Sequence, residues 1–209
     1  WRLSILFGRK PVHLVGCPSV DMALRAQHAP IVTVIELGGA GAETQLSHPI
    51  VVLQHPVTSE THDAEAQMVA TLDAVTSQPN FQTPIVFWPG EDAGAGAMSK
   101  SLRQYQTRVH TVRNLPPSRF LRLLTQASVL VGNSSAGIRE CSALGVPVVN
   151  IGSRQQGRER GPNVIDVPHD AQAIAQAIRQ QVAHGTYEAS SLYGDGDAGA
   201  KIAEILLES

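Results

Sequence analysis

Short runs of β-branched and other apolar residues alternate along the chain with longer amphipathic segments. The runs predict strands at 12–16, 49–55, 84–88, 109–112, 128–132, 147–151 and 163–167. The amphipathic segments predict helices at 21–27, 59–77, near 97–106, 117–127, 136–144, near 170–183 and near 198–208. Strands that are apolar throughout are typical of a parallel sheet covered by helices on both faces. The pattern therefore predicts an α/β fold with a doubly wound parallel sheet, of Rossmann-like type.

A glycine-dense stretch, "GGAGAE" at 38–43, lies within a predicted loop at 36–48. A dinucleotide-binding glycine loop follows a strand and opens a helix, whereas this stretch precedes a strand. We therefore expect a connection here, with no nucleotide role.

Composition narrows the class of protein. With 209 residues, 43% of them hydrophobic, the chain can fill a core without disulfides or metals. A net charge of −2 without a dense Lys/Arg run argues against binding nucleic acid or an anionic membrane, and no apolar stretch approaches the roughly 20 residues that span a bilayer. Cys17 and Cys141 have no metal-ligand or disulfide-framework spacing, which favours a reducing cytoplasm.

Polar or turn residues follow five consecutive predicted strands. They are His55-Pro56-Val57-Thr58, the segment 89–94, Leu115-Pro116, Asn133-Ser134-Ser135 and Ser153-Arg154. In a doubly wound sheet, ligands bind in the crevice beyond the carboxyl ends of the strands. The sequence therefore predicts that these residues meet at one rim of the sheet.

Ser134 and Ser135 lie where a strand turns into a helix. Free N–H groups at a helix start, together with hydroxyl donors, form a site suited to phosphate. The alternative is equally good on the local sequence: one serine caps the helix and Asn133 makes an Asx-turn.

The neighbouring charged residues extend the predicted anion site. Glu140 could accept hydrogen bonds from two vicinal ribose hydroxyls, or could serve only as a partner of the helix dipole. Arg154 could bind a diphosphate in bidentate fashion, or could be a surface arginine. The charges at 158–160 are typical of a solvated loop.

Histidine chemistry is expected at one position. His55 ends a buried-looking strand and Pro56 restricts the chain after it, so its ring suits phosphate binding or proton transfer, unless it is a core histidine bonded to backbone. The other histidines share no metal-ligand spacing, and we predict neither metal ligands nor a cofactor. Asp195 and Asp197, in "YGDGDA", are expected to form a turn and cap the last helix.

Several motifs together resemble a known family. They are "GCPSVD", "LQHPVTSE", "FWPGEDAG", "VGNSSAGIRE", "GVPVVNIGSRQQGRERGPNVIDV" and "YGDGDA". In order and spacing they resemble the C-terminal half of the UDP-N-acetylglucosamine 2-epimerases, especially the hydrolysing kind that release N-acetylmannosamine for sialic acid synthesis. The resemblance covers the chain from about Val12 onward.

The resemblance implies a role for each candidate residue. His55 would contact the diphosphate of UDP and assist catalysis, and Ser134 and Ser135 would bind phosphate. Glu140 would bind the ribose hydroxyls, Arg154 the nucleotide, and the backbone near Leu115 the uracil. The family chemistry is elimination of UDP to a glycal, followed by addition of water with inversion at C2.

It also implies a two-domain fold of the glycosyltransferase-B type, to which this chain contributes the UDP-binding half. Residues 1–11 would be the tail of a preceding element and 12–209 the UDP-binding domain. The N-terminal half, which carries most of the acid/base carboxylates, is not part of this sequence. We therefore expect the isolated chain to bind UDP or a UDP-sugar and to turn over little or none, and the full-length protein to be a homodimer.

Other functions stay open at this stage. They are an epimerase for a modified UDP-sugar, a non-hydrolysing epimerase, a glycosyltransferase and a stand-alone nucleotide-binding module. Non-hydrolysing relatives usually carry "HR.EN" where this chain has "HPVT" and "DSGG" where it has "NSSA". In relatives Asn usually stands where this chain has Gly90, which suggests a different fit to the sugar.

Overall fold

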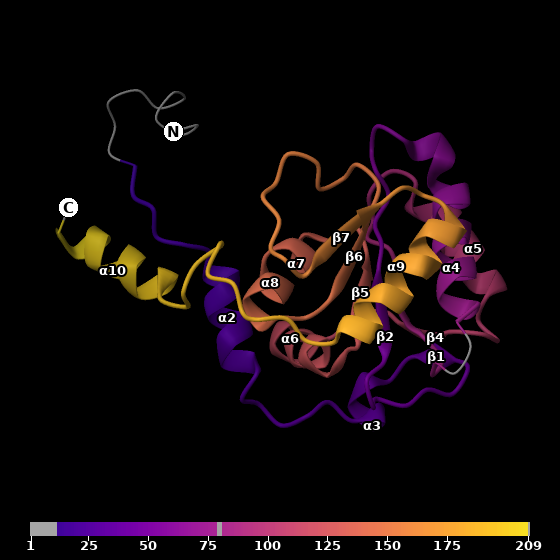
Figure 1. Cartoon of the computed structure of the whole chain (residues 1–209), viewed down its shortest axis with the longest axis horizontal. Coiled ribbons are helices and arrows are strands. Elements are labelled where there is room, and N and C mark those ends of the chain that lie inside the picture. Colours follow the sequence, from indigo (N-terminus) through magenta and orange to yellow (C-terminus); the bar gives the residue numbers. More distant parts are fainter. Residues whose placement is uncertain (1–11, 79–80, 209) are drawn as a thin grey trace.

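The apolar runs come together in one mostly parallel sheet. The computed structural model describes residues 12–78 and 81–208, and within them the sheet has seven strands in the order β1-β4-β3-β2-β5-β6-β7 (Figure 1). The strands are β1 (Ala40–Gly41), β2 (Ile50–Leu53), β3 (Ile85–Phe87), β4 (His110–Val112), β5 (Val129–Gly132), β6 (Val148–Ile151) and β7 (Val164–Val167). Neighbouring strands are parallel except β1 with β4. The predicted doubly wound sheet is confirmed, with a short antiparallel edge strand added within the predicted loop.

The strand order reverses between β2 and β5. From β2 the chain builds outward through β3 and β4, and then returns to the other side of β2 to form β5, β6 and β7. Val52 pairs with Val131 and Leu53 with Gly132 across this junction. Such a reversal is a topological switch point, where the two connecting segments diverge and leave a crevice beyond the strand ends.

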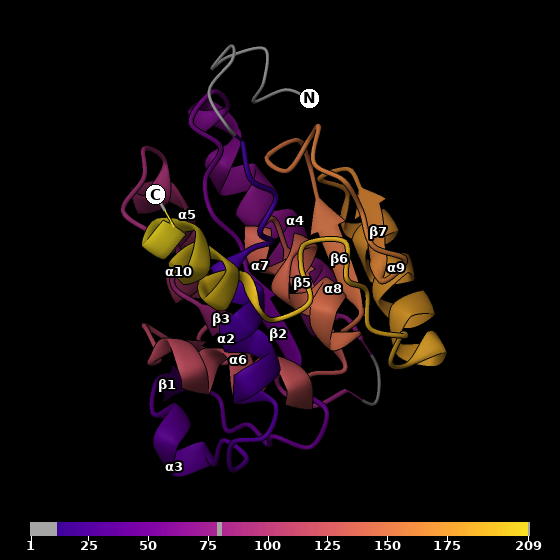
Figure 2. The same cartoon turned by 90° about the vertical axis from the view of Figure 1, so that its left-hand side faces the viewer.

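Helices cover both faces of the sheet. They are α2 (Pro18–Ala26), α3 (Val34–Leu37), η1 (Thr61–Asp63), α4 (Ala64–Thr76), α5 (Ala95–Gln104), α6 (Pro117–Gln126), α7 (Ser135–Ile138), α8 (Glu140–Leu144), α9 (Ala171–His184) and α10 (Ala198–Glu208). The core on one face joins the sheet to α4, α5 and α9, and the core on the other joins it to α2, α6, α7 and α8. Figure 2 shows β7 and α9 together at one side of the domain, and α3 with β1 at another.

The two cores explain why the central strands are apolar at every position. Ile50 and Val52 of β2 belong to the core under α4, whereas Val51 between them belongs to the opposite core. Successive side chains of a strand point to opposite faces, so a strand covered on both sides needs no polar position. All three residues are buried.

The predicted strand at 12–16 is wrong. This segment has no regular secondary structure, and the side chain of Leu14 is fully exposed. The segment pairs with none of the seven strands of the sheet, and apolar composition alone does not show whether a run finds a pairing partner. The segment leads instead into α2, where the N–H of Cys17 donates to the carbonyl of Tyr193.

Three predicted helices have different extents, and the one predicted over 21–27 begins three residues earlier, as α2. The helix predicted over 59–77 begins as the short η1 turn, since Glu60 N–H donates to the Val57 carbonyl in a preceding turn. The helix predicted over 136–144 is two helices, because the backbone of Arg139 (φ −102°, ψ −67°) breaks the regular geometry between α7 and α8. Period alone does not separate one helix from two consecutive short ones.

The cap of α10 comes from a distant residue. The N–H groups of Ala198 and Gly199 donate to the carboxylate of Asp21 at 3.1 and 2.8 Å. Asp195 instead pairs with Lys201 at 2.7 Å, and no side-chain cap of Asp197 is found among the described residues, so the predicted cap is wrong. The contact with Asp21 fixes α10 against α2, from which it extends away from the sheet (Figure 1).

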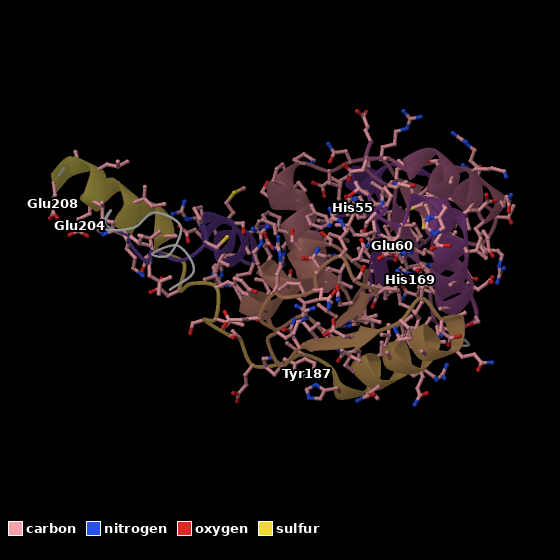
Figure 3. The ribbon with its side chains drawn as sticks, turned by 90° about the horizontal axis from the view of Figure 1, so that it is seen from above. His55, Glu60, His169, Tyr187, Glu204 and Glu208 are labelled. Atoms are coloured by element: carbon pink, nitrogen blue, oxygen red, sulfur yellow. The ribbon has the colours of Figure 1, made fainter. Side chains whose placement is uncertain are left out.

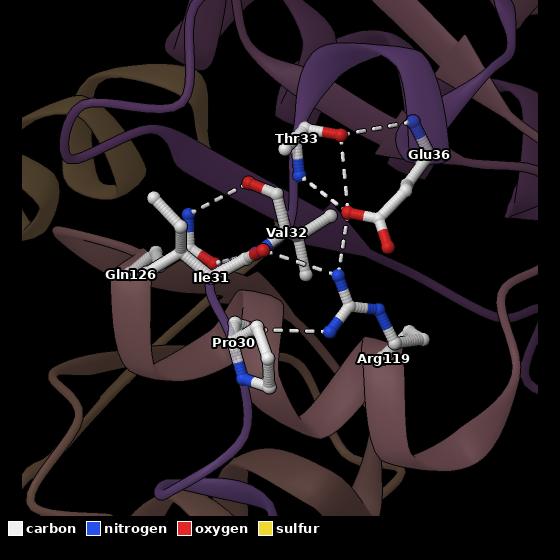
Figure 4. A network of polar contacts seen from close by, with 7 residues as sticks. All are labelled: Pro30, Ile31, Val32, Thr33, Glu36, Arg119 and Gln126. Atoms are coloured by element: carbon white, nitrogen blue, oxygen red, sulfur yellow. Dashed lines mark hydrogen bonds and ion pairs between the residues drawn. The ribbon is translucent and has the colours of Figure 1, made fainter.

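A polar network fastens the connection between α2 and α3 to α6 (Figure 4). Arg119 donates to the carbonyls of Pro30 and Ile31 and to the Glu36 carboxylate. Thr33 and Glu36 form a reciprocal capping box at the start of α3. Within this connection Val32 is buried in the core and Ile31 is exposed, so the polar network adds to a small apolar contact. No helix in the part of the chain that the structure describes has the length and apolarity needed to cross a membrane.

Candidate functional site

Asn133 joins the two strands that border the switch point. Its side-chain oxygen accepts from the N–H of His55 at 2.8 Å, and its side-chain nitrogen donates to the His55 carbonyl at 2.8 Å. Asn133 is fully buried. The alternative interpretation of Asn133 as an Asx-turn does not describe these contacts, since both ends of the amide bind backbone across the crevice.

Gly132 allows this close approach. Its φ of +138° is a backbone conformation that side chains rarely adopt, and a Cβ at this position would lie 2.2 Å from the carbonyl oxygen of Leu53. The glycine that ends the predicted strand is therefore a requirement of the crevice.

His55 lies at the edge of this crevice, half-buried. Its Nδ1 accepts a long hydrogen bond from the N–H of Gly90 at 3.4 Å. Burial lowers the pKa of His55 from its ordinary value of 6.5, and the cation of Arg154 lowers it further, while Asp92 acts in the opposite direction. The ring is therefore neutral at pH 7, and Nε2 carries its proton when Nδ1 accepts.

We expect Arg154→Met to raise the pKa of His55, because the variant removes a nearby positive charge. The folded pKa is depressed, so the unfolded chain binds more protons as pH falls below about 6.5, and this histidine destabilises the fold in that window. NMR titration of the imidazole measures the pKa, with Arg158→Met as control. A His55 pKa that does not move in Arg154→Met would contradict the expectation.

The two serines already have protein partners. Ser134 is the N-cap of α7, and its Oγ accepts from the N–H of Ala136 at 3.3 Å. Ser135 Oγ accepts from the guanidinium of Arg139 at 3.3 Å. Each hydroxyl keeps its own proton to donate. Capping and ligand binding are therefore compatible roles for these residues.

Glu140 is a buried carboxylate with one oxygen unpartnered. Its side chain is 7% exposed, and Oε1 accepts from Arg139 at 3.4 Å. Oε2 is buried and has no hydrogen-bond partner among the described residues. Leaving a buried carboxylate oxygen without a hydrogen-bond donor costs free energy, so a ligand hydroxyl that donates to Oε2 would be favourable.

Arg154 reaches the same crevice from the end of β6. Its guanidinium donates to the carbonyl of Asn133 at 3.2 Å, and the neighbouring Gln155 side chain donates to that carbonyl at 2.7 Å. Beside it lies an open pocket of about 450 Å³, lined by Pro56, Val57, Thr58, Ser59, Asp92, Ser153, Arg154 and Gln156. The structure therefore brings His55, Ser134 and Arg154 together around one residue, Asn133.

Leu115 lies farther along the same edge. It follows β4, two strands from β2, and is buried. Its N–H donates to the side chain of Asn114 at 2.9 Å, so this donor is occupied. Leu115 thus belongs to the same rim but not to the group around Asn133.

Sequence reasoning placed Asn133 at the rim but gave it only a possible Asx-turn, and it missed Arg139 as a site residue. Arg139, which bridges Ser135 and Glu140, carried no signal in the sequence, because its contacts depend on the break between α7 and α8. Within residues 12–78 and 81–208, no group of three or more His, Cys, Asp or Glu side chains is placed to hold a metal ion.

Strand order and crevice define a doubly wound α/β domain, a class that binds its ligands at the switch point. A family model described as UDP-N-acetylglucosamine 2-epimerase matches residues 5–207. The chain belongs to the UDP-N-acetylglucosamine 2-epimerase family.

Curated relatives are similar at about 30% identity. A UDP-N-acetylglucosamine 2-epimerase of Neisseria meningitidis is 31% identical over 193 residues, which are 90% of this chain and 49% of the relative. A hydrolysing UDP-N,N'-diacetylbacillosamine 2-epimerase of Legionella pneumophila is 31% identical over 157 residues, 74% of this chain and 41% of the relative. The chain thus spans about half the length of the curated relatives it matches.

Solved structures have the same fold. The Neisseria meningitidis UDP-GlcNAc 2-epimerase bound to UDP-GlcNAc matches with a TM-score of 0.72 at 16% identity, over 100% of this chain and 59% of that one. Staphylococcus aureus MnaA with UDP matches with a TM-score of 0.72 at 13% identity, over 98% of this chain and 55% of that one. These similarities confirm the glycosyltransferase-B-like epimerase fold.

Proposed function

We propose that this chain is the UDP-sugar-binding half of a hydrolysing UDP-N-acetylglucosamine 2-epimerase, which converts UDP-GlcNAc and water to N-acetylmannosamine and UDP. The observation that carries the proposal is the group around Asn133. His55 and Arg154 both contact Asn133, and Ser134 follows it directly. Imidazole N–H, guanidinium and hydroxyl groups are all donors, as a diphosphate requires.

Each residue then has a part in the reaction. Arg154, His55 and the serine hydroxyls hold the diphosphate as the C1–O bond of the sugar breaks and its electrons pass to UDP. Glu140 accepts hydrogen bonds from the ribose hydroxyls, and the backbone near Leu115 contacts uracil. The proton at C2 leaves with formation of the glycal double bond, to which water adds. We assign that proton transfer to carboxylates of an N-terminal half.

Two sequence motifs and the description of one relative support the hydrolysing type of reaction. The chain carries "HPVT" and "NSSA" where non-hydrolysing relatives usually carry "HR.EN" and "DSGG". The Legionella relative is described as hydrolysing.

A modified UDP-sugar is the second candidate substrate, and Gly90 favours it. A Cβ at this position would lie 3.5 Å from Nδ1 of His55, so a side chain here would face the crevice. Its absence leaves room beside His55 for a bulkier substituent on the sugar.

The isolated chain is expected to bind UDP and to release little or no N-acetylmannosamine from UDP-GlcNAc. Calorimetric titration with UDP measures the first, with GDP as control, and chromatography of the released sugar measures the second. Robust turnover by this chain alone would contradict the assignment of the acid/base carboxylates to another half. Failure to bind UDP would contradict the binding role.

A further inference from the structure

Glu60 connects two segments that carry candidate phosphate-binding residues. Its Oε1 accepts from the hydroxyl of Ser153 at 2.5 Å, and its Oε2 accepts from the side-chain amide of Gln67 at 2.7 Å. These two hydrogen bonds, that of Ser153 first, lower the pKa of Glu60, so the carboxylate is charged at neutral pH. Ser153 directly precedes Arg154.

The contacts continue on the other side of Glu60 to the residue before His55. The carbonyl of Gln67 accepts from the side chain of Gln54 at 3.5 Å, and the hydroxyl of Thr71 lies 3.0 Å from Gln54 Oε1 and 3.1 Å from that same carbonyl. Gln54 is fully buried and directly precedes His55. One polar network therefore reaches from the neighbour of His55 to the neighbour of Arg154.

The backbone before Arg154 is also packed against a histidine ring. The ring of His169 lies so close to Gly152 that a Cβ there would be 2.2 Å from Nε2. Figure 3 shows Glu60 between His55 and His169 in that view. His169 packs against Gly152 and Glu60 accepts from Ser153, so the backbone that leads to Arg154 has little conformational freedom. Arg154 itself is exposed.

We propose that Glu60 is a positioning residue for diphosphate binding: it holds the Ser153 segment so that the guanidinium of Arg154 faces His55 across the crevice. This inference rests on the proposed function, and it assigns a role to a residue that does not itself contact the ligand. A long arginine side chain on an unrestrained loop loses more conformational entropy on binding, and Glu60 reduces that loss in advance.

The role differs from that of a purely structural ion pair. Glu60 is partly exposed and makes two hydrogen bonds, of which the one from the buried side chain of Gln67 would be lost in Glu60→Ala. We therefore expect Glu60→Ala to lower the melting temperature modestly, whereas Ser153→Ala, which leaves the contact with Gln67 intact, should leave it nearly unchanged. In both variants UDP should bind roughly tenfold more weakly. Uridine, which has no phosphate, should bind the wild type and both variants equally.

The test is titration of the chain with UDP and with uridine, followed by NMR, for the wild type, Glu60→Ala and Ser153→Ala. Ser153→Thr keeps the hydroxyl and should restore UDP binding. The double variant should bind UDP no more weakly than either single variant. Glu65→Ala, which removes a carboxylate from the exposed surface of α4, is the matched charge control.

The outcomes separate the two proposals. If the wild-type chain does not bind UDP, the proposed function fails, and this inference with it. If the wild type binds UDP and both Glu60→Ala and Ser153→Ala bind it equally well, the binding role stands and the positioning role is wrong. If Glu60→Ala does not fold, Ser153→Ala, which lies on an exposed loop, provides the test. Weaker binding of UDP by Ser153→Ala, with unchanged binding of uridine, supports the proposal.

Discussion

Asn133→Ala is expected to lower the free energy of unfolding by about 2–4 kcal/mol and to abolish measurable UDP binding. The variant leaves the N–H and the carbonyl of His55 without their partners at the junction of β2 and β5. Because both strands direct candidate phosphate ligands into the crevice, their relative position sets the site. Chemical denaturation measures the first effect and calorimetry with UDP the second.

Asn163→Ala is the matched control. Asn163 is also buried, and its side chain donates to the carbonyl of Val146 at 2.8 Å, near the amino ends of β6 and β7. It should lose stability through one hydrogen bond, where Asn133→Ala loses two, yet bind UDP like the wild type at a temperature where both variants are folded. Equal loss of binding in the two variants would show that stability alone controls affinity, and would refute the role given to Asn133.

Glu140→Ala is expected to remove the preference for UDP over 2'-deoxy-UDP. In the wild-type chain, Oε2 of Glu140 is buried and has no hydrogen-bond partner among the described residues, and we expect a ribose hydroxyl to supply that partner. A hydrogen bond to a charged group contributes about 1.5–3 kcal/mol, so the wild type should prefer UDP by roughly tenfold or more. The variant should bind both nucleotides with the weaker affinity.

Two further variants sharpen this test. Glu140→Gln keeps an acceptor oxygen without the charge and should retain part of the preference. Glu159→Ala removes a carboxylate from the charged loop after β6 and should leave the preference intact. If Glu140→Ala discriminates between the nucleotides as the wild type does, Glu140 does not bind the ribose. Its role is then limited to the ion pair with Arg139 and the interaction with the helix dipole.

The fold was predictable because its central strands need no polar positions. Ile50, Val51 and Val52 are apolar since helices cover both faces, and the sequence shows that directly. The segment 12–16 has a similar composition but no place in the sheet, because pairing partners are chosen by the whole arrangement of strands. Likewise, the cap of α10 comes from Asp21, a residue 177 positions before Ala198 in the chain.

For the candidate site, the sequence predicted only which residues lie at the carboxyl edge of the sheet. Residues that follow parallel strands collect at the edge formed by the carboxyl ends of those strands. This rule alone predicts that His55, Ser134 and Arg154 lie at the same edge of the sheet. Their binding roles stay predictions. The sequence could not show that Ser134 caps α7 while keeping a proton to donate, or that Arg139 turns toward Ser135 and Glu140.

The sequence by itself determined the α/β class, the family and the residues at the carboxyl ends of the strands, since these depend on local periodicity and on residue type. Only the tertiary structure decided which of those residues meet. The reversal of strand order brings the ends of β2 and β5 side by side, and Asn133 binds the backbone of His55 across them. Hydrogen bonds between residues 78 positions apart depend on direction and distance in space, which no local pattern encodes.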